Sequence, residues 1–142
     1  MNKKPLSLPQ EEPVLRVLPR FYDTNQRGDI FGGWLMSQID LAGSLRAQKA
    51  AQGPVATIAV KEMLFQAPLF VGDVVSFYAE VIKVGRKSIT VEVEVYAERR
   101  QEVFPSESGE LVKAARAIFV YVAVSSPGKS RLIPTSTEPD AI

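Results

Sequence analysis

The chain of 142 residues contains no cysteine and no histidine. Without cysteine it can form no disulfide bond, no thiolate metal site and no thiol nucleophile. Without histidine it can form no histidine-based catalytic triad, no histidine–zinc site and no imidazole acid–base pair. We therefore predict no metal site. If the protein is an enzyme, its chemistry must use carboxylates, hydroxyls, amides, Lys, Arg, Tyr or backbone groups, and a carboxylate is the first candidate.

The sequence also lacks a charge imbalance and a long hydrophobic run. Lys and Arg total 17 against 16 Asp and Glu, and the two signs are interleaved, so nucleic acid is not an expected partner. No apolar run approaches the roughly 18 residues that a membrane span needs. The N-terminal MNKKPLSLPQEEP has no apolar signal-peptide segment. We expect a cytoplasmic protein without a membrane partner.

The pattern of apolar residues predicts one helix and several strands in a single domain. The helix is expected over about residues 33–52, where Gly53 and Pro54 supply a stop signal. Alternation is clearest in SITVEVEVYAER, and strands are expected over 14–18, 56–68, 74–84, 88–99 and 111–124. Because short turns join most of them, the sheet must be largely antiparallel. The predicted fold class is α+β, a long helix wrapped by a curved antiparallel sheet in the order β-α-β-β-β-β.

Three further expectations concern organisation and packing. Residues 1–13 are predicted to be a flexible leader, 14–134 the folded domain and 135–142 a disordered tail, with a polar hairpin loop over 100–110. The continuous apolar run of 111–124 suggests burial on both faces or a subunit contact. One stripe of the helix is suited to packing on the sheet and contains Leu35, Ile39, Ala42 and Leu45.

In the stretch GDIFGGWLMSQIDLAG (28–43), the glycines Gly32 and Gly33 open the predicted helix and Asp40 lies within it, although both residue types disfavour a helix. Seven residues advance a helix by about 700°, so Gly33 and Asp40 share one face about 10 Å apart. The free amides of a helix start could polarise a carbonyl oxygen. A carboxylate on the same face could attack the carbonyl carbon or activate a water molecule. The alternative is a solvated aspartate and glycines that merely mark a helix start or a close packing contact.

Several motifs resemble those of one known family. DTNQRGDIFGG lies at the loop-to-helix junction, an aspartate follows seven residues after the second glycine, and FQAPLFVGD and VGRKS come later in the chain. In this combination and order, over about residues 14–134, the chain resembles the hotdog-fold acyl-CoA thioesterases of the bacterial YciA-like type. That fold is a long helix wrapped by an antiparallel sheet, in agreement with the element order above.

The resemblance implies hydrolysis of acyl-CoA to a free acid and CoA. Asp40 matches the catalytic carboxylate, and Asn25 matches a loop asparagine that orients the water or the thioester. Gly32 and Gly33 match the glycines of the helix start, where the N–H of Gly33 or Trp34 would polarise the thioester carbonyl. Thr57 matches a threonine near the site. The resemblance further implies homodimers in which Asn25 of one subunit and Asp40 of the other form one site, and hexamers made of three dimers.

The predicted binding region for CoA follows from the same resemblance, with CoA as part of substrate and product and no separate cofactor. Phosphates favour cations and amides. The turn VGRKS offers Arg86, Lys87 and Ser88, and GKSRLIP offers Lys129 and Arg131. The alternative for each cation is an ordinary solvated turn charge. One departure from the family pattern is Lys61-Glu62, where the nearest family members carry Glu-Ser, and it bears on local charge and acyl-chain preference.

Two other functions compete with hydrolysis. A hotdog module that binds acyl-CoA without cleaving it would need no carboxylate aimed at the thioester, and the presence of both Asn25 and Asp40 favours the enzyme. A hotdog dehydratase or hydratase typically uses a histidine base, which this chain lacks. The resemblance and the residues leave open whether Asp40 acts as a general base or as a nucleophile.

Overall fold

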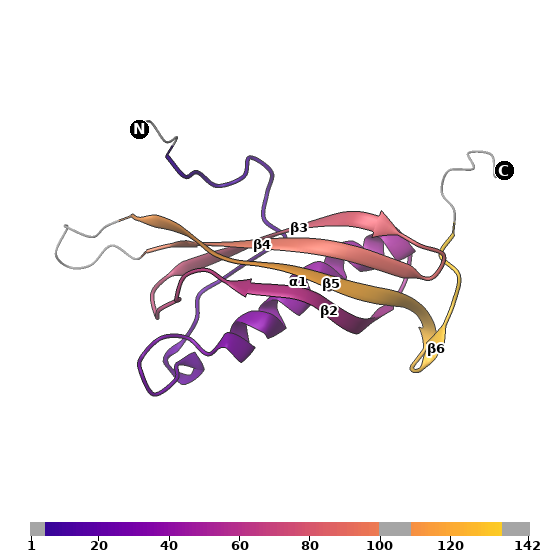
Figure 1. Cartoon of the computed structure of the whole chain (residues 1–142), viewed down its shortest axis with the longest axis horizontal. Coiled ribbons are helices and arrows are strands. Elements are labelled where there is room, and N and C mark those ends of the chain that lie inside the picture. Colours follow the sequence, from indigo (N-terminus) through magenta and orange to yellow (C-terminus); the bar gives the residue numbers. More distant parts are fainter. Residues whose placement is uncertain (1–4, 100–108, 135–142) are drawn as a thin grey trace.

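The computed structural model describes residues 5–99 and 109–134 (Figure 1). Within these residues the chain forms one long α-helix, one short 3₁₀ helix (η1) and six strands. The elements in chain order are β1 (Leu15–Val17), η1 (Phe21–Asp23), α1 (Gly32–Ala51), β2 (Val55–Phe65), β3 (Val74–Val84), β4 (Ser88–Glu98), β5 (Leu111–Ser126) and β6 (Lys129–Ser130). The predicted helix and strands are therefore confirmed to within a few residues, while η1 and β6 were not predicted.

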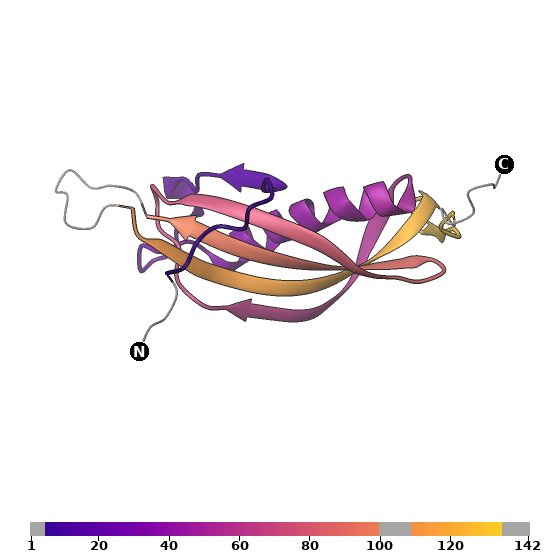
Figure 2. The same cartoon turned by 90° about the horizontal axis from the view of Figure 1, so that it is seen from above.

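The strands form one curved antiparallel sheet in the order β1-β3-β4-β5-β2, with β6 paired to β5. Helix α1 lies along its concave face, as Figures 1 and 2 show from two directions. This arrangement confirms the predicted α+β class. The helix of the described residues is not long and apolar enough to cross a membrane. Most of the expected hairpin loop (100–108) and the expected tail (135–142) lie outside the described residues.

Helix α1 packs on the sheet through small side chains at its C-terminal half. Leu35, Ile39 and Ala42 are buried as predicted, but Leu45 is 43% exposed, so its assignment to the packing stripe was wrong. The buried stripe continues instead through Gly43, Ala47 and Ala51. Small residues at these positions allow the helix to approach the sheet closely, and Leu45 lies outside the buried stripe.

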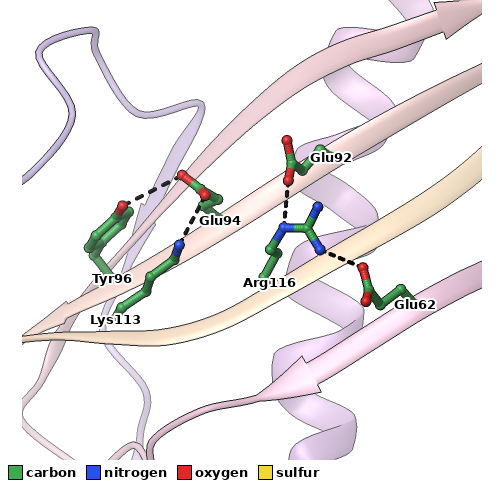
Figure 3. A network of polar contacts seen from close by, with 6 residues as sticks. All are labelled: Glu62, Glu92, Glu94, Tyr96, Lys113 and Arg116. Atoms are coloured by element: carbon green, nitrogen blue, oxygen red, sulfur yellow. Dashed lines mark hydrogen bonds and ion pairs between the residues drawn. The ribbon is translucent and has the colours of Figure 1, made fainter.

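The sheet separates an apolar concave face from a charged outer face. In β4 the residues Ile89, Val91, Val93 and Val95 are fully buried. The alternate residues point away from the helix, where Arg116 bonds to both Glu92 and Glu62 and Lys113 pairs with Glu94 at 3.0 Å (Figure 3). Glu62, part of the departure from the family pattern, thus takes part in an ion cluster on the outer face.

The chain before β1 crosses this outer face. Residues 5–13 form no helix or strand, and Figure 2 shows them running over the sheet. Pro9 and Glu11 line a cavity of about 220 Å³ together with Tyr78, Glu80 and Glu94. The boundary of the folded domain at residue 14 remains a prediction.

One buried ion pair holds the turn between β2 and β3. Asp73 is 2% exposed, and its Oδ2 accepts a hydrogen bond of 2.5 Å from Arg99 and one of 2.8 Å from the N–H of Phe70. Arg99 also donates to the carbonyl of Pro68 at 3.1 Å and stacks over the Phe70 ring. Burial raises the pKa of the Asp73 carboxyl, although the Phe70 amide and Arg99 both lower it. Arg99 therefore compensates a carboxylate whose desolvation is costly.

Removing this cation should unfold the protein more easily. We expect Arg99→Met to lower the free energy of unfolding by about 3–5 kcal/mol, because it leaves the buried Asp73 carboxylate without a counter-ion. Urea denaturation at neutral pH measures the change. Lys113→Met is the matched control, since its pair with Glu94 is about one-third exposed on both sides and should contribute about 1 kcal/mol or less. Equal effects of the two variants would contradict this account of Asp73.

Candidate active site

The structure brings the two predicted polar residues Asp40 and Thr57 together. Asp40 lies on α1 and is half-buried, and Thr57 lies near the start of β2. The Thr57 hydroxyl donates a hydrogen bond of 2.7 Å to Oδ1 of Asp40. A hydrogen bond to a carboxylate is stronger than one between neutral groups and fixes the orientation of the acceptor. Oδ1 of Asp40 is therefore held, while Oδ2 accepts no hydrogen bond from the residues that the structure describes.

The start of α1 offers free amide groups on the same helix. The N–H of Trp34 donates to the carbonyl of Phe31 at 3.1 Å, whereas Gly32 and Gly33 donate no backbone hydrogen bond within the described residues. A methyl group at Gly33 would meet nothing within 4 Å, while one at Gly32 would press on the Phe65 ring at 3.3 Å. Gly33 thus combines an N–H that has no backbone acceptor among the described residues with open space on the side where a side chain would stand.

Asn25 lies in the loop before α1 and lines a different part of the surface. Its Oδ1 accepts hydrogen bonds from the N–H groups of Arg27 and Gly28, at 2.7 Å and 3.1 Å. The loop is anchored to the β2–β3 turn, because the N–H of Ile30 donates to the Leu69 carbonyl. Asn25 lines a cavity of about 370 Å³ with residues 27, 29–32, 35 and 65–69. Asp40 is not among these residues, so Asn25 and Asp40 do not share this cavity within one protomer.

The two predicted basic segments lie side by side at the other end of the helix. Arg86 and Lys87 are exposed in the β3–β4 turn, which the N–H of Gly85 closes on the Ser88 carbonyl at 2.7 Å. The N–H of Ile133 donates to the Arg86 carbonyl at 2.8 Å, and a cavity of about 450 Å³ is lined by Val84, Gly85, Arg86, Leu132 and Ile133. The structure thus places Arg86 beside the segment that carries Arg131.

Arg131 itself has a structural role that the sequence did not indicate. Its guanidinium donates to the carbonyls of Val124 and Ala51, both at 3.0 Å. The Ala51 carbonyl belongs to the last turn of α1, where such groups lack helical partners. The guanidinium also lies so close to Gly53 that a Cβ there would be 2.6 Å from it. Arg131 therefore ties the helix end to β5, and its contact with CoA remains a prediction.

Tyr121 is a residue of the site that sequence reasoning missed. This fully buried side chain on β5 donates a hydrogen bond of 2.9 Å to the main-chain carbonyl of Asp40. Burial raises the pKa of the Tyr121 phenol far above its usual range, and the nearby Asp40 raises it further. The sequence did contain one indication of this contact. Gly43 is a glycine within the predicted helix, three residues after Asp40, and a glycine there leaves room for an aromatic ring.

The raised pKa of Tyr121 makes the fold sensitive to alkali. The unfolded phenol ionises near pH 10, whereas the folded one stays neutral, so its contribution to stability is complete below pH 10 and is lost as pH rises above it. We expect the free energy of unfolding to fall more steeply between pH 9.5 and 11 in the wild type than in Tyr121→Phe. Urea denaturation of both proteins across this range measures the slopes, and parallel slopes would contradict the assignment.

Comparison with known proteins identifies the family. The thioesterase superfamily model matches residues 27–104. The acyl-CoA thioester hydrolase YciA of Salmonella typhimurium is 47% identical over 126 residues, which cover 89% of this chain and 92% of the relative.

Two solved structures resemble the chain throughout its fold. A hexameric thioesterase from Yersinia pestis is 48% identical, with 90% and 100% of the two chains covered and a TM-score of 0.79. A hexameric hotdog fold thioesterase of Campylobacter jejuni is 40% identical, with 87% and 91% covered and a TM-score of 0.81. The long helix on a curved antiparallel sheet is therefore the hotdog fold, and the chain belongs to the YciA-like family of the thioesterase superfamily.

Proposed function

We propose that this protein hydrolyses acyl-CoA thioesters to a carboxylic acid and CoA, with Asp40 as the reacting carboxylate. The observation that carries the proposal is the hydrogen bond from Thr57 to Asp40 on the helix whose start presents free amides. In a chain without histidine or cysteine, this oriented carboxylate is the group best placed to react. The similarity to acyl-CoA thioester hydrolases supports the choice of substrate.

Gly33 is the group that polarises the thioester carbonyl. Its N–H donates no backbone hydrogen bond within the described residues, and a Cβ at this position would meet nothing within 4 Å, whereas the N–H of Trp34 already donates to Phe31. If the carbonyl oxygen of the thioester accepts a hydrogen bond from the Gly33 N–H, this donor stabilises the negative charge that develops on the oxygen during attack. Of the two amides that the sequence suggested, we therefore favour Gly33. The half-buried side chain of Trp34 lines a separate cavity with Leu18 and Val71, so its contact with substrate stays a prediction.

Two routes are compatible with this arrangement. As a general base, Asp40 takes a proton from water, the hydroxide adds to the carbonyl carbon, and the CoA thiolate leaves and is protonated. As a nucleophile, Asp40 attacks the carbonyl carbon and expels CoA, and water then opens the resulting mixed anhydride. Both routes need the free carboxylate oxygen and the Gly33 amide, so the same variants test either.

The second half of the site comes from a partner subunit. Within the described residues β2 pairs on one edge with β5 and its other edge has no partner strand. That strand exposes Ile58, Val60, Leu64 and Phe65, each by more than 40%, and such an edge favours pairing with another chain. Antiparallel pairing with its own copy, about a two-fold axis, brings the Phe65 end of one strand to the Thr57 end of the other.

This pairing assembles a complete site. The Phe65 end of β2 borders the cavity that contains Asn25, and the Thr57 end carries the contact with Asp40. Each dimer would therefore hold two sites, with Asn25 of one subunit and Asp40 of the other. The hexameric assembly of similar thioesterases supports three such dimers.

The nucleotide end of CoA binds at the opposite end of the helix. Arg86 and Lys87 are exposed cations in a tight turn, with Ser88 at its end. Cations, hydroxyls and free amides are the usual ligands of phosphates. Arg131 supports this region by holding the helix end, and its positive charge adds to that of Arg86 and Lys87.

The proposed reaction predicts release of free CoA thiol. Because the protein has no thiol of its own, a thiol reagent reports the product directly. We expect Asp40→Asn to lower kcat by at least about a hundredfold, since it removes the reacting group, while CoA binding persists. Glu80→Gln, on the outer face of β3, is the matched control and should retain activity. A wild-type protein that binds short, medium and long acyl-CoAs but releases no thiol would instead be a binding module.

Mixed dimers test the shared site. Co-refolding Asn25→Ala with Asp40→Asn subunits produces heterodimers with one intact site and one doubly altered site. Random pairing should restore about one quarter of the wild-type rate, because half of the dimers are mixed. Each variant refolded alone is the control. Absence of any recovery, with heterodimers verified by mass, would show that each site lies within one chain.

A further inference from the structure

Asp40 accepts hydrogen bonds from two hydroxyl groups that belong to neighbouring residues on adjacent strands. Thr57 on β2 and Tyr121 on β5 are directly paired in the strand register. Thr57 donates to the Asp40 carboxylate at 2.7 Å, and Tyr121 donates to its main-chain carbonyl at 2.9 Å. One pair of cross-strand neighbours therefore contacts both ends of the same residue.

The two donors differ in how firmly they are fixed. Thr57 is exposed on the edge strand, and a register shift follows it between Thr57 and Ala59. Tyr121 is fully buried on β5, which pairs with strands on both sides, and its ring stacks on Phe119 at 6.4 Å. Because buried side chains in a paired central strand have little freedom, Tyr121 is the rigid reference and Thr57 the adjustable one.

Gly43 provides the space that this contact requires. A Cβ at position 43 would lie 2.3 Å from the Tyr121 hydroxyl and 3.1 Å from the ring carbon that carries it. Every other residue type would therefore displace the phenol. A glycine in the middle of a helix lowers its stability, and here that cost allows a direct bond between the sheet core and the helix at Asp40.

We propose that Tyr121 is a positioning residue for Asp40, admitted by Gly43, which sets the height of the carboxylate above the sheet while Thr57 sets its orientation. The inference rests on the proposed role of Asp40 in hydrolysis. Because Tyr121 is fully buried, we assign it no contact with the substrate. Loss of the Tyr121 hydroxyl should therefore slow the chemical step and leave substrate binding unchanged.

Tyr121→Phe tests this role because it removes the hydroxyl and keeps the ring. We expect kcat to fall about tenfold, as loss of one orienting hydrogen bond allows, with KM within about twofold. The matched control is Tyr96→Phe, another buried tyrosine hydroxyl but on the outer face of β4, and it should keep the wild-type kcat. An unchanged kcat in Tyr121→Phe, or an equal fall in both variants, would overturn the proposal.

A double variant distinguishes an effect of Tyr121 on Asp40 from a general loss of structure. In Asp40→Asn protein assayed at high enzyme concentration, adding Tyr121→Phe should change the residual rate by less than about twofold, because the residue it positions no longer reacts. A further tenfold fall there would show that Tyr121 acts independently of Asp40. If Asp40→Asn itself retains the wild-type rate, the proposed function fails, whatever the result for Tyr121.

Gly43→Ala provides the same test without altering the tyrosine. The added methyl group forces the phenol away from the Asp40 carbonyl, so kcat should fall at least as much as in Tyr121→Phe, again with KM preserved. A Gly43→Ala protein with the wild-type kcat would contradict the proposal. This variant also decides the question if Tyr121→Phe does not fold.

Discussion

The structure depends on a close approach between helix α1 and the concave face of the sheet at Asp40. Small residues such as Ala42, Gly43 and Ala47 are buried there, and they bring the helix near enough for side chains of β2 and β5 to reach it. This proximity allows two hydrogen bonds to Asp40, one from Thr57 to its carboxylate and one from Tyr121 to its main-chain carbonyl. With larger residues at these positions the fold could keep its topology, but Asp40 would lose both contacts.

The same packing underlies the proposal that each active site needs two protomers. Asp40 faces the exposed edge strand β2, and the cavity that contains Asn25 lies toward the other end of that strand. A single chain therefore separates the two polar residues that the family resemblance pairs. In the proposed dimer, antiparallel association of two β2 edges brings these residues together and also covers the exposed apolar side chains. The proposal thus links assembly and catalysis through strand β2.

The periodic pattern of apolar residues in the sequence was sufficient to predict the helix and the main strands, and the short turns between them to predict an antiparallel sheet. Asp40 and Gly33 followed from helical geometry, and Thr57 and Asn25 from the resemblance. The roles of Tyr121, Arg131 and Arg99 were not predicted, because each acts on a residue far away in the chain and has no local pattern. Leu45 was misplaced for a related reason, since a stripe drawn on an isolated helix does not say how closely the sheet approaches. Arg131 shows the same limit, because a turn cation that suits a phosphate can equally bind backbone carbonyls.

The most direct test is a crystal structure of the Asp40→Asn protein bound to an uncleaved acyl-CoA. The account predicts a dimer paired through β2, with the thioester carbonyl oxygen on the N–H of Gly33 and the carbonyl carbon between residue 40 of one subunit and Asn25 of the partner subunit. A thioester held within a single chain, away from residue 40, would contradict it.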